Sequence, residues 1–155
     1  MILHGATLVF KALVLMLCCV IESSGLFPMF TLFLYSVWTS QEKNIFEHVF
    51  FIFVLILILG IAIPLSWQVL SILVCVTAAA SRVITTKMSN QHKNKGRALV
   101  AIVTGSVLVY AWQAEAFKAQ WMSLVIYAGC LFVYAVWLDM QVRKQKTHNW
   151  LSFSQ

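Results

Sequence analysis

Charged residues are scarce in this sequence. Only 10% of the 155 residues are charged, whereas 61% are hydrophobic, and the mean hydropathy is +0.87. Soluble domains carry about 25% charged residues, and a small folded chain leaves a large share of its surface exposed. A soluble fold has too little interior for so many apolar side chains. We therefore expect an all-α integral membrane protein in which lipid surrounds most of the side chains.

Patterns typical of catalytic and metal sites are also missing. Cys18, Cys19, Cys75 and Cys130 all lie in apolar runs and form neither a CxxC motif nor a Cys/His motif. Isolated cysteines pack as small hydrophobes. No His–Glu pair has the spacing of metal ligands, and no serine or cysteine has a base beside it. We expect no cofactor, no metal site and no enzymatic activity.

The five acidic residues lie at the ends of apolar segments or in a loop. Glu115 and Lys118 are three positions apart, so they face each other on a helix. The ordinary interpretation is an ion pair at the surface. Alternatively, the two residues contact a partner protein, or Glu115 is a carboxylate with a role in transport or catalysis. Asp139 is expected to pair with Arg143, four positions on. At these positions, and at Glu22 after the first apolar run, we expect water to reach the carboxylates.

Six membrane-spanning helices can be placed along the chain. A crossing needs about 20 largely apolar residues, and the stretch Ile45–Thr85 is about twice as long. Gly60 and Pro64 interrupt it, and a residue before proline avoids helical geometry, so we expect a tight turn there. Pro28 opens the short second span, where a helix tolerates proline. The expected spans are Ile2–Ile21, Leu26–Trp38, two within Ile45–Thr85, Ala98–Phe117 and Trp121–Met140.

The basic residues indicate the orientation of these spans. With six crossings, the two ends of the chain share one side with the loops Ser40–Asn44 and Lys87–Arg97. Positively charged loops stay in the cytoplasm, so both termini are expected there. A compact transmembrane domain, 1–140, then precedes a basic cytoplasmic tail, 141–155. The cytoplasmic side holds ten of the eleven Lys and Arg residues, all except Lys118: Lys11, Lys43, Arg82, Lys87, Lys93, Lys95, Arg97, Arg143, Lys144 and Lys146.

The net charge of +6 is explained by membrane contact and requires no nucleic acid. A Lys or Arg near an anionic lipid surface contributes about 1 kcal/mol. Anionic lipids are therefore expected partners of the basic loop and tail. The candidate contact residues are Lys87, Lys93, Lys95, Arg97, Arg143, Lys144 and Lys146.

The order of these features resembles the rod shape-determining protein MreD family. The first span ends at a polar residue, here Glu22, and a proline, here Pro28, opens the second. The third span breaks at a glycine-containing turn, here Gly60 to Pro64, and a basic loop precedes two final spans and a basic tail. The likeness extends from about Leu13 to Lys146. The chain lacks the acidic residue that the family commonly has shortly after that glycine.

The resemblance implies a non-enzymatic scaffold of the cell-elongation (cell-shape) complex in the bacterial inner membrane. Its partners would be integral membrane proteins, namely MreC-like and wall-synthesis proteins. The implied six-helix fold is similar to that of the substrate-binding components of vitamin transporters. A small-molecule transporter subunit and an immunity protein against a pore-forming toxin stay open as alternatives. The candidate partner-binding residues are Glu22, Pro28, Gly60, Pro64, Glu115 and Lys118.

Overall fold

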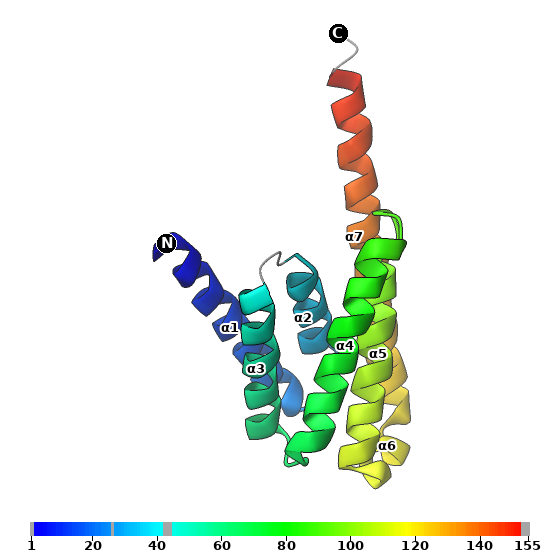
Figure 1. Ribbon diagram of the computed structural model, residues 1–155. Helices are drawn as coiled ribbons and strands as arrows, with labels where there is room; N and C mark the ends of the chain where they lie inside the picture. The colour runs from blue at the N-terminus through cyan, green and yellow to red at the C-terminus, as the bar shows by residue number, and fades with distance from the viewer. Residues whose placement is uncertain (1, 26, 42–44, 153–155) are drawn as a thin grey trace.

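Every secondary-structure element in the described part of the chain is an α-helix, which confirms that the fold is all-α (Figure 1). The computed structural model describes positions 2–25, 27–41 and 45–152, with side chains at 5–25, 27–41 and 45–144. The helices are α1 (Ile2–Ser23), α2 (Met29–Gln41), α3 (Ile45–Ala62), α4 (Trp67–Lys87), α5 (Lys93–Trp112), α6 (Ala114–Ala119) and α7 (Trp121–Ser152).

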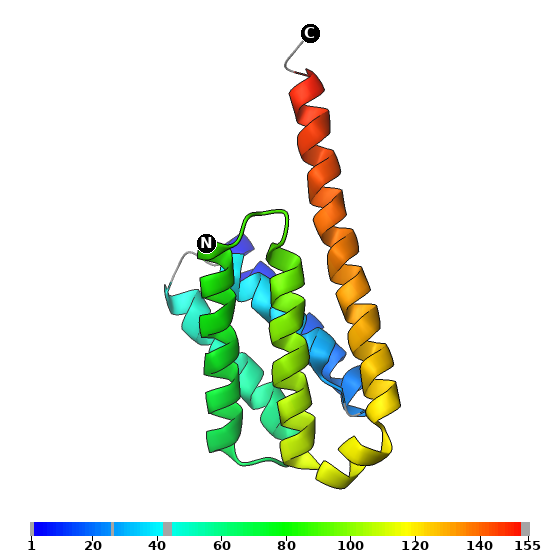
Figure 2. The ribbon, with the colours of Figure 1, turned by 90° about the vertical axis from the view of Figure 1, so that its right-hand side faces the viewer.

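The long helices alternate in direction, so the two ends of the chain point to the same side of the bundle (Figures 1 and 2). Helix α5 lies at the centre and packs against α2, α4 and α7. Helix α1 lies at one edge, where its backbone lies close to those of α2 and α3. Helix α7 forms the other edge and extends far beyond the neighbouring helix ends (Figure 2).

Four segments are long and apolar enough to cross a membrane: Gly5–Ser23, Ile45–Ala62, Trp67–Lys87 and Trp121–Lys144. The other two expected spans differ from these. Helix α2 has 13 residues, fewer than the roughly 17–25 that a crossing needs. Helix α5 begins Lys-Asn-Lys-Gly-Arg, so its first turns are hydrophilic. The composition of four helices therefore supports a membrane protein.

The expected turn within Ile45–Thr85 is confirmed, because α3 ends at Ala62 and α4 begins at Trp67. Gly60 packs closely against Trp67 at this turn. A Cβ atom at position 60 would lie 2.6 Å from a ring carbon of Trp67, so any larger residue would displace the indole. The backbone carbonyl of Pro28 accepts a hydrogen bond from the Leu32 N–H at 3.2 Å, at the start of α2. Gly60, Pro64 and Pro28 thus all shape helix ends.

Several helix boundaries differ from expectation: α2 is Met29–Gln41 rather than Leu26–Trp38, and α5 begins at Lys93 rather than at Ala98. The fifth helix ends at Trp112, not at Phe117, because Gln113 leaves helical backbone geometry (φ −148°, ψ 89°). The chain then turns into α6, and the Phe117 ring packs edge-on against Tyr110 with centroids 5.7 Å apart. At the other end, α7 continues to Ser152, so positions 141–152 extend the last helix. That segment contains neither glycine nor proline and is rich in Gln, Lys and Arg, which favour helix.

Candidate functional site

The carboxylate of Glu22 is buried where three helices meet. Glu22 lies in the last turn of α1 and is only 8% exposed. One carboxylate oxygen accepts the N–H of Phe30 at 2.7 Å, and the other accepts the N–H and the hydroxyl of Thr31 at 2.8 and 2.6 Å. The hydroxyl of Tyr127 on α7 also donates to Glu22. This side chain therefore connects α1, α2 and α7.

The bonding of Glu22 is explained by the start of α2. The first N–H groups of a helix have no partner within the helix, and a side-chain oxygen just before the helix usually accepts them. Pro28 occupies that place here and has no such oxygen. Glu22 supplies the acceptor from the preceding helix, and its negative charge is favourable at a helix N-terminus. These charge-assisted hydrogen bonds are stronger than neutral ones.

Asp139 on α7 repeats this arrangement at the opposite end of the bundle. Its side chain is 1% exposed, and its two oxygens accept the backbone N–H groups of Asn94 and Lys95 at 3.2 and 3.1 Å. These are the second and third residues of α5, the same positions that Glu22 caps on α2. His92, which precedes α5, makes no side-chain capping bond. Asp139 thus caps a helix whose start lacks a local acceptor.

Arg97 lies beside this second cap and is 7% exposed. Its guanidinium donates to Asn94 Oδ1 at 3.1 Å, to Ser40 Oγ at 2.6 Å and to Thr85 Oγ1 at 3.3 Å. The carboxylate of Asp139 interacts with it electrostatically. The Nε atom is buried and has no hydrogen-bond partner. Arg97 therefore joins α5 to the end of α2 and to α4, while its buried Nε–H has no acceptor.

A cleft of about 460 Å³ opens next to Arg97, between α2, α5 and α7. Its polar residues come mainly from the start of α5 and the loop before it, and its apolar residues come from α2 and α7. The lining residues are Phe33, Leu34, Val37, Gln41, Asn90, Lys93, Asn94, Arg97, Tyr134, Leu138 and Val142.

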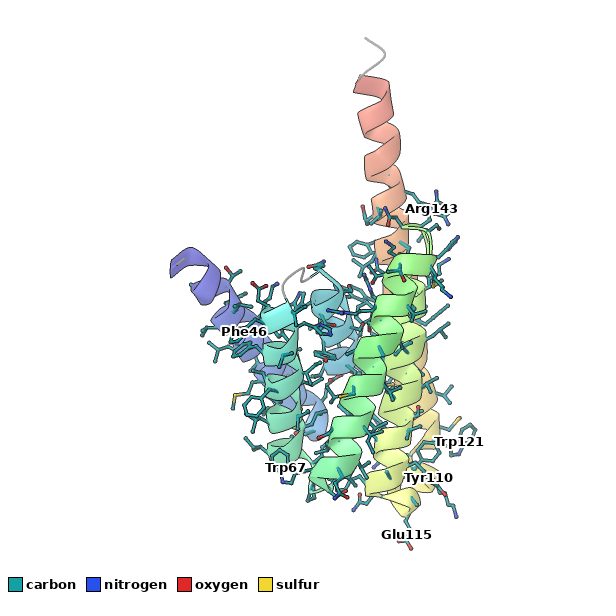
Figure 3. All side chains as sticks on the ribbon, viewed as in Figure 1. Phe46, Trp67, Tyr110, Glu115, Trp121 and Arg143 are labelled. Carbon is teal, nitrogen blue, oxygen red and sulfur yellow. The ribbon has the colours of Figure 1, made fainter. Side chains whose placement is uncertain are left out.

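The structure corrects the expectation that water reaches all the acidic side chains. Glu22 and Asp139 are buried, and Glu47 is only 9% exposed. Glu115 and Lys118 are exposed on the short helix α6, and no ion pair joins them in the described structure. Figure 3 shows Glu115 at the end of the bundle, directed away from it.

The basic residues expected at lipid lie in different surroundings. Lys87 is exposed, Lys93 and Lys95 are half-buried at the start of α5, and Arg143 and Lys144 are exposed on α7. Arg97 differs from the expectation, because its hydrogen bonds hold it inside the bundle. The side chain of Lys146 lies outside the described residues. Figure 3 shows Arg143 and Glu115 toward opposite ends of the bundle.

Sequence reasoning missed the partners of these buried charges, since Thr31 and Tyr127 at Glu22, and Ser40 and Thr85 at Arg97, carry no motif. Their only signal is indirect: α2 and α5 both begin without a serine, threonine, aspartate or asparagine directly before them. Among the side chains that the structure describes, no three His, Cys, Asp or Glu residues lie close enough to share a metal ion. No known protein family, curated protein or solved structure matches this chain.

Proposed function

We propose that this chain is a six-pass protein of the bacterial inner membrane, with both termini in the cytoplasm, that holds other membrane proteins as a non-enzymatic scaffold. The MreD resemblance makes the cell-elongation complex the proposed setting. Glu22 and Asp139 support a structural role, because their oxygens are occupied by backbone N–H groups of neighbouring helices. Such bonds stabilise the relative positions of the helices, as a scaffold requires.

The observation that carries the proposal is an apolar groove on α7. It has a volume of about 610 Å³ and is lined by Ile126, Gly129, Cys130, Val133, Tyr134 and Trp137. No atom lies within 4 Å of the place that a Cβ atom on Gly129 would take. Small residues allow helices in lipid to approach closely. Gly105, by contrast, is already covered by Met29 of the same chain. The open groove fits an apolar transmembrane helix of another protein.

Site-specific photo-cross-linking tests this surface in living cells. A photo-reactive residue at Val133, which is 67% exposed in the groove, should yield a discrete cross-linked product. The same residue at Ile72 on α4, which is 63% exposed, should yield only lipid adducts. Gly129→Leu should remove the Val133 product by filling the groove. A product that survives Gly129→Leu, or that forms equally at Ile72, contradicts the proposal.

The identity of the cross-linked protein separates the proposed settings. An MreC-like or wall-synthesis protein supports the cell-elongation complex. A transporter subunit that hydrolyses ATP would instead make this chain a transporter component. A pore-forming toxin would make it an immunity protein.

A further inference from the structure

The cleft between α2, α5 and α7 has one polar end and one apolar end. Both α2 and α7 rise toward the loop at 88–92 (Figures 1 and 2). Along α2 the lining runs Phe33, Val37, Gln41, and along α7 it runs Tyr134, Leu138, Val142. Each series has a spacing of four residues, so each forms a stripe about 12 Å long on one helix face. The two stripes run side by side and form an elongated groove.

The upper end of this groove is basic. Lys93 and Arg97 line it together with Asn90, Asn94 and Gln41, and none of the lining residues among the described side chains is acidic. The nearby carboxylate of Asp139 is occupied by the N–H groups of Asn94 and Lys95. Arg97 is 7% exposed and keeps one buried N–H without a partner. Arginine forms directional hydrogen bonds with phosphate oxygens, and lysine adds a point charge.

We propose that this cleft binds one anionic phospholipid, with its phosphodiester headgroup at Lys93 and Arg97 and an acyl chain between α2 and α7. The inference rests on the membrane placement in the proposed function, which puts this end of the bundle at the cytoplasmic headgroup level. A lipid bound in this cleft differs from the diffuse attraction of exposed basic residues to an anionic membrane surface. Lys87 is exposed and lies outside the cleft, so it contributes only to the diffuse attraction.

Native mass spectrometry of the full chain in detergent tests this site. With equimolar phosphatidylglycerol and phosphatidylcholine of identical acyl chains, one phosphatidylglycerol should remain bound in preference. Lys93→Gln should lower its retention about fivefold, the factor that corresponds to about 1 kcal/mol for one lysine. Lys87→Gln, which removes the same charge outside the cleft, should leave retention unchanged. Equal effects of the two variants, or equal retention of the two lipids, would overturn the proposal.

The apolar wall is tested by a second pair of variants. Leu34→Trp should fill the cleft and lower lipid retention, whereas Val103→Trp on an exposed position of α5 should not. If Leu34→Trp disturbs folding, the lysine pair still decides the question.

A third arm distinguishes a lipid from a free anion. Inorganic phosphate at millimolar concentration should not displace the lipid, because it makes no contact with the apolar wall. Displacement at that concentration would show a small-anion site and refute the lipid assignment. If the wild-type protein forms the Val133 cross-link but shows no lipid selectivity, only this inference is overturned. If it shows lipid selectivity but forms no Val133 cross-link, only the scaffold proposal is overturned.

Discussion

Replacing Glu22 with glutamine should lower the free energy of unfolding by about 3 kcal/mol, because buried donors lose their acceptor. The carboxylate accepts four hydrogen bonds through two oxygens. A glutamine side chain offers only one acceptor oxygen. Its NH₂ group would face either the Phe30 N–H and the Tyr127 hydroxyl or the N–H and hydroxyl of Thr31. Thermal unfolding of the purified protein in detergent measures the change. Cys19 is fully buried near Glu22, so its modification by a thiol reagent reports the loss of stability independently.

Glu115→Gln is the matched control, since it makes the same chemical change on the exposed helix α6. It should leave the unfolding temperature unchanged. Equal stability of Glu22→Gln and the wild-type protein would show that Glu22 does not hold α1, α2 and α7 together. The burial of Glu22 is the reason for this expectation, whereas the sequence alone led us to expect a carboxylate in contact with water.

Gly105→Leu should destabilise the protein by about 3 kcal/mol, since overpacking forces packed helices apart. A Cβ atom at position 105 would lie 2.8 Å from Met29 Cγ and 3.7 Å from Leu32 Cδ1. Met29 is fully buried, so it has no free space into which it can move. The added side chain would therefore push the start of α2 away from α5. The same thermal unfolding experiment measures the loss.

Gly129→Leu provides the comparison for this variant, because no atom surrounds the position of its Cβ. It should unfold at the wild-type temperature while it removes the Val133 cross-link. If both glycine variants are equally stable, the close approach of α2 and α5 is not a determinant of the fold.

Hydrogen bonds from Glu22 and Arg97 explain how a short helix is held in the bundle. Helix α2 has only 13 residues, and isolated helices of that length are marginal. Glu22 binds the N–H groups at its start, and Arg97 binds Ser40 near its end. Both ends of α2 are thus attached to other helices. Packing against α5 at Gly105 supports it between these points.

Sequence patterns located most of the helices, because apolar length and turn residues are local signals. The turn near Pro64 and the start of α2 near Pro28 follow from backbone geometry alone. In the run of small residues 78–81 on α4, Ala78 and Ser81 are buried in the bundle, whereas Ala79 is exposed.

The buried carboxylates could not be located in this way, because each pairs with backbone groups of another helix. Asp139 and the N–H of Asn94 are separated by 45 positions. A carboxylate at the end of a membrane span is as compatible with contact with water as with burial. The informative signal was the missing local cap: in an apolar surrounding the first N–H groups of every helix need an acceptor. Pro28 and His92 supply none, and the chain has only five acidic residues.

The orientation of the bundle is tested most directly by two serines in turns between helices. Ser66 lies between α3 and α4, and Ser89 lies between α4 and α5; both are exposed. Each is replaced by cysteine in a background in which the four native cysteines are serine. In intact cells an impermeant thiol reagent should label Ser66→Cys, and should label Ser89→Cys only after the membrane is opened. Labelling of Ser89→Cys in intact cells, or of Ser66→Cys only after opening, would contradict the proposed membrane topology.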